Sequence, residues 1–182
     1  MSIKDDTFCP LPWLHLGTHP HGGVTPCCIS DMTAGKNRAR NYGKERDEFF
    51  NLNDHDIETH MNSDYFKEIR KEMLNDVEPK ACKRCYDEER KGIKSKRVHE
   101  SEVYKDFNPD YASRLTSEDG SIPMDLRFVE LRLGNVCNVR CRTCNPASSS
   151  RWVSDYKKIV DSLEFVNDGY SWLDHKHDFQ WP

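Results

Sequence analysis

Eight cysteines at closely spaced positions constrain this chain more than any other feature of its sequence. The first fifteen residues lack the apolar core of a signal peptide, so clustered thiols indicate metal binding or catalysis before disulfides. A secreted scaffold with four disulfides is therefore the less favoured alternative. The cysteines are Cys9, Cys27, Cys28, Cys82, Cys85, Cys137, Cys141 and Cys144.

The composition bounds the class of protein. The chain has 182 residues, enough for one domain or two small ones. Charged residues make up 32% and the net charge is −4, so bulk electrostatics indicates no nucleic-acid or membrane partner. No stretch approaches the roughly 18–20 apolar residues of a membrane span. We expect a soluble, cytoplasmic protein that binds neither nucleic acid nor membrane.

Two helices are predicted in the middle of the chain. Residues 63–76 have a suitable N-cap in Ser63, and their apolar residues at i, i+3 and i+7 share one face. Residues 82–92 predict a second helix, because Gly92 is a natural C-terminal stop. The apolar face of the first helix consists of Phe66, Ile69 and Met73.

The other segments before residue 125 carry weaker signals. Residues 7–30 are rich in Pro and Gly and predict loops and short strands. Residues 31–62 predict a loop, or a short helix around Glu45–Phe50. Residues 95–124 look irregular, with Gly120 and Pro123 as breakers.

A strand, a loop and a helix are predicted near the C-terminus. Asp125–Leu133 carries apolar residues on both faces, which is typical of a buried parallel strand. A cysteine loop follows, and residues 148–150 offer a cap for a helix with an apolar stripe. That stripe consists of Trp152, Tyr156, Ile159, Val160 and Leu163.

The cysteine loop spaces Cys137, Cys141 and Cys144 as CxxxCxxC. Three thiolates leave one iron of a four-iron cluster without a protein ligand, and an open position is typical of a reactive metal site. The alternative is a structural zinc site with a remote fourth ligand such as Cys28 or a histidine.

This region resembles the radical S-adenosylmethionine (radical SAM) enzymes. The resemblance rests on Glu130–Cys137 and Cys144–Ser150, which are similar to the first strand, cluster loop and first helix of that family. It implies a [4Fe–4S] cluster on Cys137, Cys141 and Cys144 whose open iron binds S-adenosylmethionine, and reductive cleavage of that cofactor to a 5′-deoxyadenosyl radical. It also implies a reductant such as flavodoxin or ferredoxin, and a substrate that is a peptide or a small molecule.

The upstream cysteines can form a second, closed site. Cys9, Cys27, Cys82 and Cys85 supply four thiols, and a CxxC pair reaches one centre from a single helical turn. Adjacent residues of an extended chain point different ways, so one of Cys27 and Cys28 is expected to ligate. Zinc is the alternative occupant here, with support from three nearby histidines, His15, His19 and His21.

This pattern resembles the twitch module, a shortened SPASM domain that carries an auxiliary [4Fe–4S] cluster in many radical SAM enzymes. The resemblance includes the Cys9-to-Trp13 start and Gly22, which is followed by four residues and then the Cys27–Cys28 pair. It also includes the CxxC of Cys82 and Cys85 and the residues after it. Those residues are Glu88, Glu89, Gly92, Ser95 and Arg97.

The expected fold is α/β (α+β overall), with a small Cys-rich module followed by the first strand–loop–helix of a partial TIM barrel. We expect the auxiliary module over residues 1–100, a linker over 101–124 and the start of the barrel over 125–182. A barrel needs on the order of 200 residues. We therefore expect a fragment of a longer protein, or a split protein completed by another chain. The alternative function is a non-catalytic zinc-binding interaction module.

Overall fold

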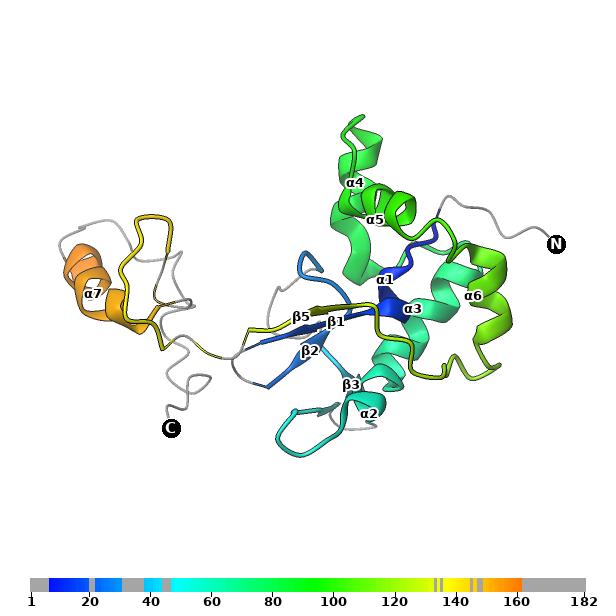
Figure 1. Ribbon diagram of the computed structural model, residues 1–182, viewed down its shortest axis with the longest axis horizontal. Helices are drawn as coiled ribbons and strands as arrows, with labels where there is room; N and C mark the ends of the chain where they lie inside the picture. The colour runs from blue at the N-terminus through cyan, green and yellow to red at the C-terminus, as the bar shows by residue number, and fades with distance from the viewer. Residues whose placement is uncertain are drawn as a thin grey trace. The chain divides into compact units, whose positions relative to one another are not determined.

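The computed structural model of the protein (Figure 1) falls into two compact units. Unit 1 comprises Met1–Thr18 with Gly22–Leu131, and unit 2 comprises His19–His21 with Arg132–Pro182. The predicted domain boundaries at residues 100 and 124 stay a prediction. The structure describes residues 7–19, 22–30, 38–43, 47–132, 134, 136–144, 146 and 149–161, without the side chains of residues 157, 160 and 161.

Unit 1 combines short helices with two small sheets. Its helices are α1 (Leu11–Leu14), α2 (Ile57–Met61), α3 (Asp64–Leu74), α4 (Lys83–Arg90), α5 (Lys96–Val103) and α6 (Pro109–Leu115), with a 3-10 turn at Lys80–Cys82. Its strands are β1 (His15–Thr18), β2 (Val24–Thr25), β3 (Arg40–Asn41), β4 (Glu48–Phe49) and β5 (Phe128–Glu130). None of the described helices has both the length and the apolar character needed to cross a membrane.

The central sheet joins segments from opposite ends of the chain. Its strand order is β2-β1-β5, with β1 antiparallel to β2 and parallel to β5 (Figure 1). Leu16 lies opposite Val129 in the parallel pair. The N–H of Ala39 donates to the carbonyl of Val24 at 2.8 Å, which ties the β3–β4 sheet to β2. The parallel strand predicted ahead of the C-terminal cysteine loop is thus present, paired with the strand that follows Cys9.

The two predicted helices are confirmed. α3 begins after Ser63, and its three predicted core residues, Phe66, Ile69 and Met73, are at most 2% exposed. α4 ends just before Gly92, whose φ of +73° and N–H bond to the carbonyl of Glu89 are typical of a helix stop. Trp13 is fully buried against Phe8 and Phe107, with ring centroids 5.4 and 6.3 Å away, so it belongs to the core.

The prediction of irregular structure over residues 95–124 is wrong, because α5 and α6 lie there. Each helix has an N-cap whose side chain accepts a backbone N–H, Ser95 from Val98 and Asn108 from Tyr111. Pro109 occupies the first helical position of α6, where its missing N–H costs nothing. Local capping therefore starts two short helices whose apolar periodicity is weak.

Two further predictions are corrected by strand pairing. The segment around Glu45–Phe50 is no helix in its described part, residues 47–50, because β4 pairs with β3 and the N–H of Phe50 donates to Ala39. The strand predicted over Asp125–Leu133 is shorter and not buried on both faces. Val129 is 44% exposed, since in the described part of the chain only β1 pairs with β5.

Stability should fall in mild acid because of a buried histidine. His60 is fully buried near Phe50, and burial lowers its pKa from the ordinary value near 6.5. As the pH drops below about 6.5, the unfolded chain binds a proton at this histidine before the folded chain does. The unfolding free energy should therefore decrease by up to about 1.4 kcal/mol for each unit by which the pH is lowered.

Urea denaturation of the metal-free chain between pH 7.5 and 5.5 measures this slope. We expect His60→Leu to reduce this slope, because one of two buried histidines no longer titrates; burial also lowers the pKa of His15, which should account for part of the slope that stays. His99→Leu, at an exposed position, should leave the slope unchanged. Equal slopes in the wild-type and His60→Leu chains would contradict the assignment.

Candidate metal centres

Four thiols of unit 1 line a single cavity. Cys9 precedes α1, Cys27 follows β2, and Cys82 and Cys85 lie three residues apart at the start of α4. The sequence forms this arrangement locally, because the 3-10 turn that ends at Cys82 runs directly into α4 and puts both thiols of the CxxC pair on one side. The walls between the thiols are largely apolar, with contributions from Leu11, Pro12, Pro26, Ile29 and Ala81. Of the adjacent cysteines Cys27 and Cys28, it is Cys27 that lines this cavity.

The thiols surround the cavity without meeting at one point. Among the residues that the structure describes, no three or more Cys, His, Asp or Glu side chains are arranged to hold one metal ion. The free space is small, about 20 Å³, which is about the room of one water molecule. A larger inorganic group would therefore have to move side chains on the wall outward.

The four thiols affect one another's pKa values. Burial raises the pKa of all four, to about 12 for Cys27 and well above the ordinary value for Cys9. Neighbouring thiols raise the values further, since Cys9 interacts with Cys82, Cys27 and Cys85. Four thiolates so close together are stable only around a positively charged centre, so the donor set suits a metal centre that replaces the thiol protons.

Backbone amides point at three of these sulfurs. The N–H groups of Leu11, Ile29 and Arg97 hydrogen-bond to Cys9, Cys27 and Cys85 respectively and lower the pKa of each thiol against the effect of burial. Two of these donors lie two residues after the cysteine they serve, a spacing that is visible in the sequence. Hydrogen bonds to sulfur are one of the means by which proteins adjust iron–sulfur centres.

A charged clamp holds the start of α5 against this site. Arg97 is 8% exposed; its guanidinium bonds to both carboxylate oxygens of Glu89, and it donates to the carbonyl of Phe8 at 2.9 Å. The hydroxyl of Ser95 also bonds to Glu89. Arg97 is therefore a buried cation compensated by Glu89, although Arg90 of the same basic segment is exposed.

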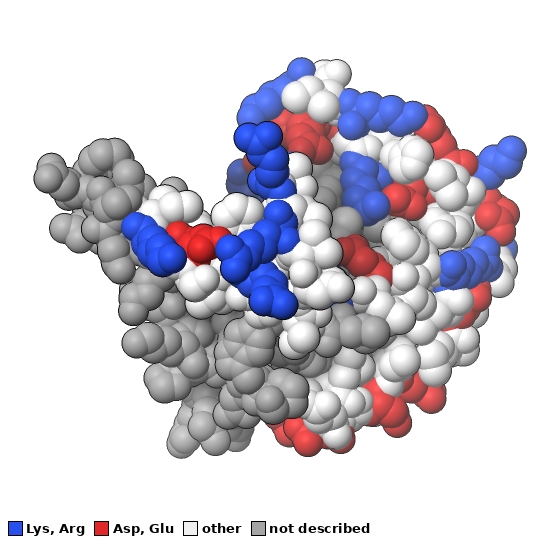
Figure 2. Space-filling view, turned by 60° about the vertical axis from the view of Figure 1, so that its left-hand side comes forward, with Lys and Arg blue, Asp and Glu red and all other residues white. Residues whose placement is uncertain are grey.

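On the face shown in Figure 2, the other basic residues that the structure describes are interspersed with acidic ones. In the predicted basic segment Lys36–Arg46, the described Arg38 and Arg40 stack on aromatic rings, 4.6 Å from the centroids of Phe49 and Tyr65. The other basic residues of that segment lie outside the described residues.

The histidines near the first cysteines are not arranged as metal ligands. His15 is buried; its Nδ1 lies 2.9 Å from the carbonyl of Pro26, and its ring packs on Phe128. His19 is buried too, at 9% exposure. His21 lies outside the described residues.

The C-terminal cysteines belong to unit 2, on a loop braced by a helix. The N–H of Cys144 donates to the carbonyl of Cys141 at 3.0 Å, and the indole of Trp152 donates to the same carbonyl at 3.0 Å. The predicted helix is present as α7 (Val153–Asp161), after a 3-10 turn at Ser150–Trp152. Cys141 is exposed, and Cys137 and Cys144 are half-buried. Leu163 of the predicted stripe lies outside the described residues.

One comparison with known proteins bears on these centres. Residues 9–86 match the family model of SPASM, described as an iron–sulfur cluster-binding domain. The match begins at Cys9 and ends one residue after Cys85, so it contains all four thiols of the unit 1 cavity but covers less than half of the chain. No curated protein and no solved structure matches the chain. The match supports iron–sulfur binding by unit 1, of the kind found in radical SAM enzymes.

Proposed function

We propose that this chain is part of a radical SAM enzyme with two iron–sulfur clusters. The first is an auxiliary [4Fe–4S] cluster held by Cys9, Cys27, Cys82 and Cys85. The main support for this cluster is that these four thiols line one cavity and all lie within the residues that match an iron–sulfur domain. With four protein ligands the cluster is closed, so its role is structural or in electron transfer.

The second proposed cluster binds Cys137, Cys141 and Cys144 and leaves one iron open for S-adenosylmethionine. When bound, the cluster supplies the electron that cleaves this cofactor. The proposal is supported by the CxxxCxxC spacing after a parallel strand, and by a loop whose thiols are exposed or half-buried. The chain's own residues hold this loop in place. The indole N–H of Trp152 donates to the carbonyl of Cys141, and the hydroxyl of Ser149 donates to the carbonyl of Val139 at 2.9 Å.

A zinc-binding interaction module is the competing function. Tetrahedral zinc with Zn–S bonds of about 2.3 Å brings its thiolates within about 4 Å of one another. The four thiols of unit 1 would supply the full ligand set of either a zinc ion or a four-iron cluster, so the metal content of the reconstituted protein decides between the two functions.

Anaerobic reconstitution of the full chain with iron and sulfide tests the proposal. We expect about eight irons per chain, and about four when Cys137, Cys141 and Cys144 are all replaced by alanine. S-adenosylmethionine should change the EPR spectrum of the reduced wild-type protein and leave that of the triple variant unchanged. A colourless protein that retains only zinc would sink the proposal.

The partners follow from the same proposal. The open-site cluster needs an electron donor such as flavodoxin or ferredoxin. We propose that the strands completing the barrel come from further sequence or from another chain, and that they bring the contacts to S-adenosylmethionine. The substrate would be a peptide or a small molecule.

A further inference from the structure

One ion pair on the wall of the unit 1 cavity is not part of the proposed ligand set. Lys96 lines the cavity together with the four thiols, and its ammonium lies 2.9 Å from a carboxylate oxygen of Glu100. The two side chains are only 23% and 8% exposed. Burial acts to lower the pKa of Lys96, but Glu100 and the thiols of Cys28 and Cys27 outweigh it and raise the pKa, so Lys96 is charged at neutral pH.

The backbone on both sides fixes this lysine in place. Lys96 is the first residue of α5, and Ser95 caps the helix by accepting the N–H of Val98. The next residue, Arg97, is anchored on Glu89 of α4 and on the carbonyl of Phe8, and its own N–H points at Cys85. The lysine ammonium also lies 5.5 Å from the ring centroid of Phe128. The charge therefore has a fixed position beside the thiols.

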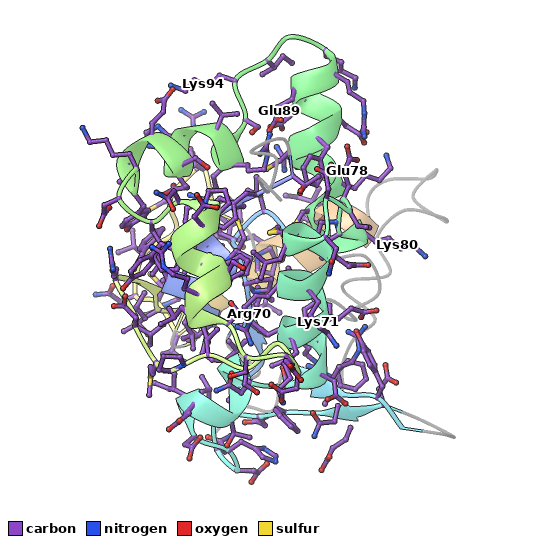
Figure 3. All side chains as sticks on the ribbon, turned by 90° about the vertical axis from the view of Figure 1, so that its right-hand side faces the viewer. Arg70, Lys71, Glu78, Lys80, Glu89 and Lys94 are labelled. Atoms are coloured by element: carbon purple, nitrogen blue, oxygen red, sulfur yellow. The ribbon has the colours of Figure 1, made fainter. Side chains whose placement is uncertain are left out.

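A second lysine–glutamate pair on the same hairpin provides a comparison. Lys94 pairs with Glu102, but these side chains are 55% and 60% exposed. Figure 3 shows Lys94 near the outer end of the hairpin formed by α4 and α5, and Glu89 between the two helices. The Lys94–Glu102 pair has the same charges two residues away, in contact with solvent and away from the cavity wall.

We propose that the Lys96–Glu100 pair sets the reduction potential of the auxiliary cluster, with Lys96 raising it and Glu100 lowering it. This inference rests on the proposed function, since it needs a cluster on the four thiols. A cluster with four thiolate ligands is anionic and gains a further negative charge on reduction. Poorly solvated charges on its wall therefore act more strongly on the reduced state than charges screened by water.

The test is a redox titration of the full chain in which Cys137, Cys141 and Cys144 are replaced by alanine, so that only the auxiliary cluster reports. Dithionite is the reductant, and visible absorbance and EPR give the reduced fraction. At a fixed solution potential, Lys96→Met should lower the ratio of reduced to oxidised cluster about tenfold, the order expected for one nearby charge at an effective dielectric constant of about 20. Glu100→Gln should raise the ratio, and the double variant should return close to the parent.

The matched controls are Lys94→Met and Glu102→Gln, which should leave the midpoint potential unchanged, and Lys96→Arg, which keeps the charge and should stay near the parent. Unchanged potentials in both wall variants, or shifts of the same sign, overturn the inference while the proposed function stands. A folded chain that takes up no iron and sulfide overturns the proposed function and this inference with it. Iron and sulfide analysis before each titration separates the two failures.

Discussion

Replacing Cys27 by alanine is expected to remove the auxiliary cluster, whereas replacing the adjacent Cys28 should leave it in place. Cys27 lines the cavity, its sulfur receives the N–H of Ile29, and it interacts with the thiolate forms of Cys9 and Cys82. Loss of one of four thiolate ligands leaves an iron exposed in an otherwise apolar wall. Iron analysis after anaerobic reconstitution should therefore fall by about four per chain in Cys27→Ala.

The adjacent cysteine, Cys28, provides a matched control for this comparison. Both variants remove one thiol of the same size from the same turn, so a general effect of losing a cysteine would appear in both. We expect Cys28→Ala to keep the wild-type iron content and absorption. The reverse result, with iron lost in Cys28→Ala and kept in Cys27→Ala, would show that Cys28 is the ligand; loss in neither would contradict a four-thiol site.

The sequence alone predicted which thiols of unit 1 come together better than it predicted the architecture around them. The cysteine spacing selected four thiols that the fold brings to one cavity, because CxxC on a helical start is a local geometry. The choice between Cys27 and Cys28 was not local. It depends on how the turn after β2 packs against α4, which no spacing rule encodes.

The errors in the predicted fold also arise where structure depends on contacts that sequence periodicity does not show. α5 and α6 are short and lack a strong apolar stripe, so their formation depends on the caps at Ser95 and Asn108. β4 has only two residues and exists because β3 pairs with it. The burial of Arg97 is equally hard to predict, because a charge run on a helix usually faces solvent, while here Glu89 compensates the buried guanidinium.

The pairing of β1 with β5 links the two halves of the proposal. Leu16 lies opposite Val129 in parallel register, so the carboxyl ends of both strands reach the same edge of the sheet. One strand follows the first cysteine of the auxiliary site, and the other leads toward Cys137. The sheet thus joins the proposed auxiliary module to the first strand of the proposed barrel.

Replacing Arg70 by methionine should have the largest effect on stability. Arg70 is fully buried and donates to three backbone carbonyls, those of Gly120 at 2.9 Å, Pro12 at 3.1 Å and Met61 at 2.7 Å. It thereby joins α3 to α1, to the end of α2 and to the segment after α6. Burial lowers its pKa to about 9, so the guanidinium is still charged at neutral pH.

Gly120 is part of the same arrangement. Its φ is +90°, and a Cβ there would lie 2.8 Å from the carbonyl oxygen of Lys67. Only glycine allows the chain to approach α3 this closely and direct its carbonyl at Arg70. The buried guanidinium therefore has backbone acceptors in fixed positions instead of a carboxylate partner.

In Arg70→Met the side chain keeps an unbranched apolar stem, but it is shorter and loses every donor. Three buried carbonyls lose their bonds, at about 1–3 kcal/mol each, and relief of the buried charge offsets part of that cost. We expect the unfolding free energy to fall by about 3 kcal/mol, measured by urea denaturation of the metal-free chain. Arg70→Lys should recover little, because an ammonium cannot reach three carbonyls with the planar fork of arginine.

The neighbouring residue supplies the control. Lys71 follows Arg70 on α3 (both are labelled in Figure 3) and is exposed. Lys71→Met makes a similar change in chemistry on the same helix and should alter stability by no more than about 0.5 kcal/mol. If Arg70→Met were as stable as Lys71→Met, the carbonyls around Arg70 would have to find other donors, and its role as the link between these segments would be wrong.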